Sequence, residues 1–320
     1  MTIDSEILAN YGGIQKNSLT HILRELGETD TENNEPELLE HSPYMNTNLV
    51  CEILSKKQDA VKVLSLNCQS LFSKFDELKA FIEIMRERGI FFNVICLQET
   101  WIAENMNISL LNINGYELVS QSRSCSRHGG LAIYLDSRFS HRKLSVAETT
   151  QSLWEHQFIE INSDSWNQKS LIIGNIYRLP RQLNDDITDF MKRFSDILSN
   201  FEDTTKEIMI CGDFNIDLLR VRENSGVSDF LVKLQSHSFI PKITVPTRFS
   251  ENRATLIDNI FCRASNNFSN STAGVLVNKI SDHQPYFITL NNLSQTKPPP
   301  KVIQYLNMTK QPWINSKTSY

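Results

Sequence analysis

The chain has 320 residues, 40% of them hydrophobic and 22% charged, with a formal net charge of −5, which is an ordinary globular composition. It contains no run of 18 apolar residues and has an early acidic residue, so we expect no membrane span and no secretory signal, and place the protein inside the cell, in the nucleus or the cytoplasm. The six cysteines include no CxxC pair, which argues against a zinc finger and a disulfide framework.

Residues 1–58 are predicted to form an acidic, largely flexible N-terminal extension. Residues 1–60 contain 11 acidic and 4 basic residues, and the polar segment 27–48 is poor in aromatic side chains. The rest of the chain then carries a net charge of +2. This balance permits a polyanionic substrate but does not demand one.

Residues 59–292 are predicted to form one α/β domain. The apolar strand 61–67 precedes a helix with Leu78, Ile82 and Met85 on one face, which Ser73 is expected to cap and Gly89 to end. Further strands are expected at 91–99, 129–135, 153–161, 170–177, 207–215, 256–262, 274–277 and 285–290, and further helices near 185–200 and 227–236. Many strands with few helices favour two mixed sheets packed together, with helices on their outer faces. Residues 293–320 are predicted to be a proline-rich tail or linker.

Five of these strands begin or end with carboxylate, amide or imidazole side chains. The positions are Asn67, Glu99, Asp213 with Asn215, Asp258, and Asp282 with His283. Any one of them alone is typical of a turn. Five together indicate one ligand site, because loops at strand ends display polar groups over a rigid base.

The residue types predict a divalent-cation site. Asn67, Glu99 and Asp282 are hard oxygen donors, and no Cys or His accompanies Glu99, so Mg²⁺ or Mn²⁺ fits better than zinc. Such an ion would neutralise a phosphodiester and stabilise the oxygen that leaves.

The strand ends also predict phosphate chemistry. Asp213 and Asn215 are two residues apart and point the same way in a strand, so the carboxylate can activate or orient water while the amide holds phosphate. Tyr177 offers a phenolic donor to the same phosphate, and Arg178 can contact a backbone phosphate.

His283 is predicted to donate to phosphoryl oxygens as negative charge builds on them. A buried carboxylate that accepts from the other ring nitrogen would fix the tautomer and favour the imidazolium form. Asp258 is the candidate for that orienting acid.

The ordered motifs "LNCQS", "LQET", "NIYRLP", "GDFN", "PTRF" before "LIDNIF", and "SDHQP" resemble the endonuclease/exonuclease/phosphatase superfamily over roughly residues 61–292. The resemblance implies a four-layered α-β-β-α sandwich, as in deoxyribonuclease I. It also implies that Glu99 is the main metal ligand, supported by Asn67 and Asp282. Catalytic positions match Asp213, Asn215, Tyr177, His283 and its partner Asp258, and Arg178, Thr247 and Arg248 are expected to contact DNA.

Within this superfamily the chain looks most like the endonuclease domain of non-LTR retrotransposons. That resemblance implies nicking of one DNA strand, which leaves a 3′ hydroxyl that primes reverse transcription. A reverse transcriptase domain follows in full-length relatives and is absent here, so we expect a truncated or degenerate copy, or a fragmentary gene model. Abasic-site repair is disfavoured because Gln69 stands where apurinic enzymes carry an aspartate, and no aromatic pocket is evident near Asp258.

Two alternatives stay open at this stage. The same machinery serves phosphatases and phosphodiesterases that act on inositol lipid, sphingomyelin or RNA, and only the loops distinguish these substrates. The chain can also be a catalytically silent relic of a retrotransposon that acts as a binding module.

Overall fold

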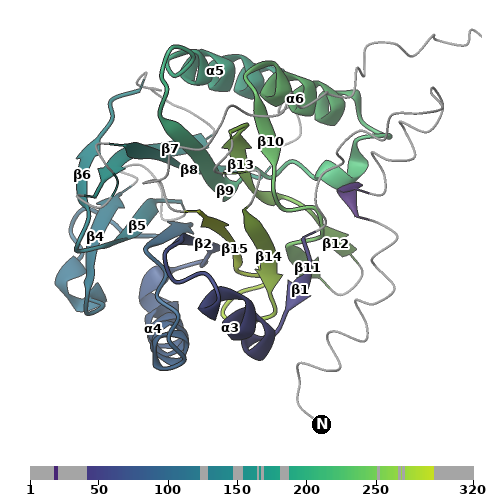
Figure 1. Ribbon diagram of the computed structural model, residues 1–320. Helices are drawn as coiled ribbons and strands as arrows, with labels where there is room; N and C mark the ends of the chain where they lie inside the picture. The colour runs from purple at the N-terminus through teal and green to yellow at the C-terminus, as the bar shows by residue number, and fades with distance from the viewer. Residues whose placement is uncertain are drawn as a thin grey trace, which may run out of the picture.

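The computed structural model describes residues 18–20, 42–122, 129–146, 154–163, 166, 169–180, 187–250, 253–265, 268 and 271–291. Two sheets lie face to face at the centre, with α5 and α6 along one outer face and α3 and α4 along the other (Figure 1). The fold is therefore the predicted four-layered α-β-β-α sandwich. No helix in the described part of the chain is long and apolar enough to cross a membrane.

The first sheet has seven strands and is mixed. Their order is β1 (Tyr44–Met45), β14 (Thr272–Leu276), β15 (Tyr286–Leu290), β2 (Val61–Asn67), β3 (Val94–Gln98), β5 (Leu131–Asp136) and β4 (Tyr116–Gln121). β2 runs parallel to β3 and β1 runs parallel to β14, while the remaining pairs are antiparallel. Both ends of the folded segment thus enter this sheet.

The second sheet has six strands, in the order β10 (Phe239–Pro241), β13 (Asp258–Arg263), β9 (Glu207–Asp213), β8 (Ser170–Arg178), β7 (Trp154–Asn162) and β6 (Ser140–Lys143). Only β8 and β9 are parallel in it. A separate antiparallel pair, β11 (Arg248–Ser250) and β12 (Arg253–Thr255), leads into β13.

The helices follow from their apolar spacing. α4 (Leu71–Glu87) buries Leu71, Leu78, Phe81, Ile82 and Met85, and its start is capped by Ser70, whose Oγ accepts from the Ser73 backbone N–H, rather than by Ser73 as predicted. Gly89, with φ of +79°, follows its end as predicted. The other helices are α3 (Thr47–Ser55), α5 (Ile187–Ser199) and α6 (Ser225–Ser236), with short 3-10 helices η2 (Ile108–Leu111) and η4 (Leu218–Arg220).

Side-chain alternation along the strands divides the core in two. In β2, Val61 and Val63 join the cluster between the sheets, which continues beneath α5 and α6, whereas Leu64 and Leu66 join a second cluster with α3 and α4. By the same alternation Ser65 and Asn67 face the second sheet. Strand periodicity therefore puts these polar side chains on one face of β2, and the packing of the sheets makes it the face between them.

Residues 42–58 lie in the segment expected to be a flexible extension, yet β1 and α3 complete the seven-stranded sheet and its outer layer. The folded unit thus begins before residue 59. The predicted tail 293–320 lies outside the described residues.

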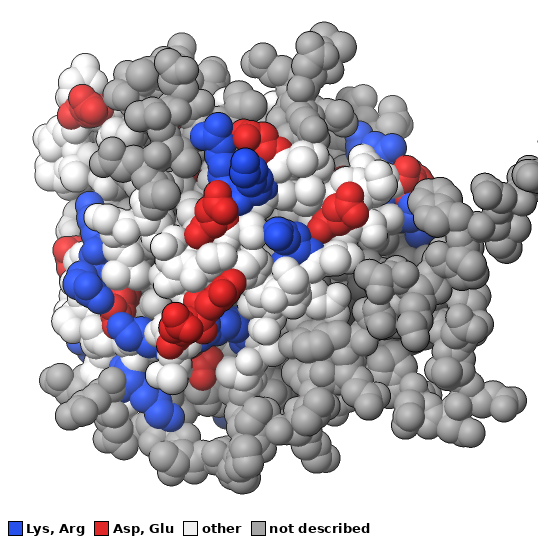
Figure 2. Space-filling model, turned by 90° about the horizontal axis from the view of Figure 1, so that it is seen from above, with Lys and Arg blue, Asp and Glu red and all other residues white. Residues whose placement is uncertain are grey.

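The outer face formed by α5 and α6 carries mixed charge. Figure 2 views the molecule from above this layer, and the basic and acidic side chains visible there are interspersed instead of forming one patch of a single sign. Within α5, Arg193 forms an ion pair with Asp189.

Candidate active site

The strand directions bring the predicted polar positions to one edge. β2 runs parallel to β3, and β8 runs parallel to β9, so the carboxyl ends of each pair lie side by side. Asn67 of β2 is therefore opposite Gln98 of β3, and Tyr177 of β8 is opposite Asp213 of β9. β13 is antiparallel to β9, so its first residue, Asp258, pairs with Asp213. β15 is antiparallel to β2, which places the residues just before β15 at the same edge.

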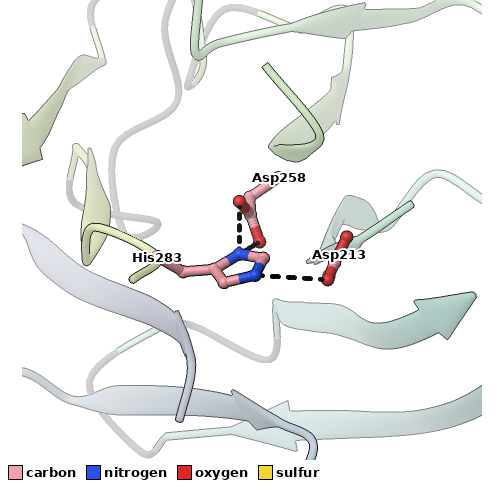
Figure 3. A group of neighbouring side chains, drawn as sticks. All are labelled: Asp213, Asp258 and His283. Carbon is pink, nitrogen blue, oxygen red and sulfur yellow. Dashed lines mark hydrogen bonds and ion pairs between the residues drawn. The ribbon is translucent and has the colours of Figure 1, made fainter. Parts of the chain in front are cut away.

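Asp213, Asp258 and His283 form the centre of the site (Figure 3). Nδ1 of His283 lies 2.9 Å from both carboxylate oxygens of Asp258, and Nε2 lies 4.0 Å from Oδ2 of Asp213. All three residues are buried. The carboxylate of Asp258 therefore fixes Nδ1 as the protonated ring nitrogen and leaves Nε2 directed toward Asp213.

Asn67 connects this centre to Glu99. Its Nδ2 donates to Oε1 of Glu99 at 2.8 Å and to Oδ2 of Asp213 at 2.9 Å, while its Oδ1 accepts from the Gln69 backbone N–H. Nε1 of Trp101 donates to the other oxygen of Glu99 at 3.3 Å. The predicted residues Glu99, Asn67, Asp213, His283 and Asp258 are thus brought together in one continuous series of contacts.

The carboxylates perturb the proton affinities of their neighbours. Burial, together with the charge of Asp258, raises the pKa of Asp213 to about 7. Burial alone would lower the pKa of His283, but the charge and hydrogen bond of Asp258, with the charges of Asp213 and Asp282, raise it to about 9. Burial and the charge of Glu99 hold the pKa of Tyr177 well above its usual range, so its phenol stays protonated and can donate.

Backbone strain gathers at this edge. Among the described residues, six that are not glycine have positive φ, and five of them are Gln69, Ser70, Glu99, Trp101 and Asn215. These five lie in the loops that follow β2, β3 and β9. Such conformations cost of the order of 1–3 kcal/mol each and concentrate at functional sites. Gly212 is also constrained, because a Cβ there would lie 2.1 Å from the carbonyl oxygen of Ile176.

Two residues predicted to contact DNA have other roles. Thr247 is fully buried, and its Oγ1 donates to Oδ2 of Asp258 at 2.6 Å, so it holds the carboxylate that orients His283. Arg178 is 3% exposed, with its guanidinium 3.5 Å from the carbonyl oxygens of Phe214 and Asn215. Both side chains are buried in this structure, and their contact with DNA stays a prediction.

Asn215 and Arg248 occupy the rim of the site. Nδ2 of Asn215 donates to the Arg178 carbonyl at 2.6 Å, and its backbone N–H donates to Oδ1 of Asp213. Nε of Arg248 donates to Oδ2 of Asp282 at 2.9 Å, and both of these side chains are more than one-third exposed. Arg248 is therefore the one predicted DNA contact that is accessible.

Ser281 is a positioning residue that the sequence did not reveal. Its Oγ donates to the Asn67 carbonyl at 2.7 Å and accepts from the His283 backbone N–H at 3.0 Å. One hydroxyl thus ties the loop after β2 to the segment before β15. In the sequence Ser281 was visible only as a typical turn residue, because its partner lies 214 positions away.

Two groups of residues could hold a divalent cation. Ligand atoms of Asp213, Asp258 and His283 lie within 4.8 Å of one another. Alternatively, Oδ1 of Asp282 is buried and has no hydrogen-bond partner among the described residues, and the Glu99 carboxylate is only partly buried. Nε2 of His283 lies 3.9 Å from this oxygen of Asp282. Carboxylate oxygens of this kind fit a hard cation such as Mg²⁺ or Mn²⁺.

Comparison with known proteins identifies the family and the fold. The profile of the "Endonuclease/Exonuclease/phosphatase family" matches residues 64–283, so the chain belongs to that family, as its motifs predicted. No curated protein sequence matches the chain.

Several solved structures share the fold. The endonuclease domain of TRAS1, a telomere-specific non-LTR retrotransposon, is 14% identical and aligns over 73% of this chain and 99% of its own, with a TM-score of 0.52. The AP endonuclease LMAP from Leishmania major is 14% identical over 73% of this chain and 88% of its own, with a TM-score of 0.57. The 3′ phosphatase NExo from Neisseria, bound to a product DNA hairpin, is 13% identical over 72% of this chain and 100% of its own, with a TM-score of 0.55. These similarities confirm the predicted fold class.

Proposed function

We propose that this protein is a divalent-cation-dependent DNA endonuclease that nicks one strand and leaves a 3′ hydroxyl able to prime reverse transcription. The observation that carries the proposal is the series of contacts from Glu99 through Asn67 and Asp213 to His283 and Asp258. DNA is the substrate we favour because two similar proteins are named as endonucleases and a third is bound to DNA.

In this proposal each side chain at the centre of the site has a separate role. Asp213, with a pKa of about 7, accepts the proton of the attacking water. His283 is an imidazolium at neutral pH and donates through Nε2 to a phosphoryl oxygen, while Asp258 and Thr247 hold its ring. The hydroxyl of Tyr177 donates a hydrogen bond to the same phosphate.

Glu99 and Asp282 would hold the divalent cation, which when bound would neutralise negative charge on the scissile phosphate and stabilise the leaving oxygen. We favour these ligands over Asp258, because both oxygens of Asp258 already face Nδ1 of His283. Asn67 would keep Glu99 in place by donating to it.

Incubation of the protein with supercoiled plasmid tests the proposal. We expect open circles with Mg²⁺ or Mn²⁺, none with EDTA, and nicks that a DNA polymerase extends without prior phosphatase treatment. His283→Ala should reduce nicking by about 10²–10⁴-fold, since it removes a positioned proton donor. His141→Ala is the matched control and should nick normally, because His141 pairs with Glu117 on β4, outside the series of contacts.

Supercoiled plasmid that stays intact with both cations would contradict the proposal. Release of phosphate from an inositol lipid under the same conditions would then support a phosphatase of the same family. Inertness toward both substrates would favour the silent binding module.

A further inference from the structure

A chain of buried polar side chains crosses the space between the two sheets. Its members are Asn175, Gln98, Ser65 and Tyr286, which we call the inter-sheet polar chain, and all four are fully buried. Nε2 of Gln98 donates to Oδ1 of Asn175 at 2.7 Å and to Oγ of Ser65 at 3.1 Å, and Oγ of Ser65 donates to the Tyr286 hydroxyl at 2.9 Å. The residues around it are apolar. Apolar contacts do not depend on direction, whereas the hydrogen bonds of the inter-sheet polar chain require a defined geometry.

Both ends of the inter-sheet polar chain bind the backbone of the opposite sheet. Asn175 lies in β8 of the six-stranded sheet, and its Nδ2 donates to the Leu97 and Ala132 carbonyls of the seven-stranded sheet at 3.1 Å. Tyr286 lies in β15 of the seven-stranded sheet, and its hydroxyl donates to the Gly212 carbonyl of β9 at 3.1 Å. Each sheet therefore contributes a side chain that donates a hydrogen bond to the backbone of the other sheet.

Four residues in these contacts lie one or two positions from a member of the candidate site. Ser65 precedes Asn67 by two residues in β2, Asn175 precedes Tyr177 by two in β8, Gln98 directly precedes Glu99, and Gly212 directly precedes Asp213. The site itself is divided between the sheets, since Asn67 and Glu99 come from one and Asp213 from the other. The inter-sheet polar chain thus lies directly behind the point where the two halves meet.

Gln98 is not the side chain that stability alone would favour, and the same holds for Gln157, whose Oε1 is also buried without a hydrogen-bond partner among the described residues. Oε1 of Gln98 is buried without a hydrogen-bond partner in the same part of the chain, and an unsatisfied buried acceptor is destabilising. An apolar side chain of similar shape would remove this unsatisfied acceptor, but it would also take away the donor to Oδ1 of Asn175. What an apolar side chain would not supply is a directional bond to the opposite sheet.

We propose that Gln98 and Tyr286 are positioning residues that fix the two sheets in the one placement where Nδ2 of Asn67 reaches both Glu99 and Asp213. Apolar packing permits small sliding between sheets, whereas a displacement of about 1 Å at a reaction site can cost on the order of 10²-fold in rate. The kinetic part of this inference rests on the proposed nuclease function.

The test compares Gln98→Met, Tyr286→Phe and the double variant with a matched control. Tyr286→Phe retains the ring and removes only the hydroxyl. The control is Gln157→Met, because Gln157 is also buried and its Nε2 donates across the sheets to the Val119 carbonyl at 2.9 Å, one strand farther from the site. We expect kcat for plasmid nicking to fall about 10-fold in each single variant and about 10–100-fold in the double variant, with KM within about twofold. The control should lose comparable thermal stability and keep kcat within about twofold.

Crystal structures of Gln98→Met and Gln157→Met supply a readout that does not need activity. The Asn67 Nδ2 to Asp213 Oδ2 distance of 2.9 Å should exceed 3.5 Å in Gln98→Met and remain unchanged in Gln157→Met. A wild-type protein that nicks no plasmid would refute the nuclease proposal, and this distance would still decide the positioning inference. An unchanged distance in Gln98→Met, or kcat values equal to that of the control, would overturn it.

Discussion

At the scale of single residues, Asp213 and His283 have pKa values that suit opposite tasks. Asp213 is a carboxyl group whose pKa burial and the charge of Asp258 raise to about 7, so it can accept a proton near neutral pH. The carboxylates around His283 raise its pKa to about 9, despite its burial, so it stays cationic there. Between these two values Asp213 is ionised and His283 is protonated, which is the combination that the proposed mechanism requires.

The dependence of nicking on pH follows from these two groups. We expect kcat/KM to rise through about pH 7 as Asp213 loses its proton, and to fall through about pH 9 as His283 loses its own. Asp258→Asn should move the falling limb to lower pH, because the variant lacks the charge that favours imidazolium. Nicking rates measured from pH 5.5 to 10 check this prediction. If the falling limb of Asp258→Asn lay at the same pH as that of the wild type, the assignment of this limb to His283 would be contradicted.

At the scale of secondary-structure elements, β1 and α3 contribute to the core from a segment that composition marks as acidic and flexible. The side chains of Met45, Val50 and Leu54 are at most 1% exposed. The Met45 carbonyl accepts a hydrogen bond from the Val277 backbone N–H. Burial of three such side chains stabilises the fold by about 1.5–3 kcal/mol each. β14 and β15 separate β1 from β2, so this contribution concerns stability more than the site.

Two truncations separate the extension from the domain. Deletion of residues 2–41 removes Leu19, the one apolar core residue described before residue 42, whereas deletion of 2–58 also removes β1 and α3. We expect the longer deletion to melt roughly 10 °C or more below the shorter one, because about 2–4 °C accompany each kcal/mol in a domain of this size. If the two deletion variants had equal melting temperatures in scanning calorimetry, the folded domain would begin at residue 59, as the sequence predicted.

At the scale of the whole molecule, the site sets a pH dependence of stability. The folded-state pKa values of Asp213 and His283 both lie above their ordinary values of 3.8 and 6.5. The folded protein therefore retains protons that the unfolded chain releases, and the free energy of unfolding falls as pH rises. The contribution of His283 to the free energy of unfolding is fully present below about pH 6.5 and is lost as pH rises through about 9.

Urea denaturation in EDTA measures this effect without interference from divalent cations. Between pH 6 and pH 9.5 we expect the His283 contribution to fall by roughly 3 kcal/mol, since each tenfold change in proton affinity corresponds to about 1.4 kcal/mol. His283→Gln is the comparison, because it keeps a donor toward Asp258 but cannot titrate. If both proteins lost stability equally over this range, His283 would not have the raised pKa.

The sequence by itself determined nine of the described strands, the two-sheet class, the family and several residues that meet at the site, whereas it did not predict the strands β1, β4, β6, β10, β11 and β12. Those features depend on local patterns: alternation in β2, polar residues at Asn67, Glu99 and Asp213, and motifs in a characteristic order. The tertiary structure decided which direction each polar side chain faces. Thr247 and Arg178 are polar and lie next to site residues, but burial turned them toward Asp258 and the loop after β9. The contacts of Ser281 with Asn67, and of Gln98 with Asn175, join residues far apart in the chain, and only the packing of one sheet on the other brings such residues within hydrogen-bond distance.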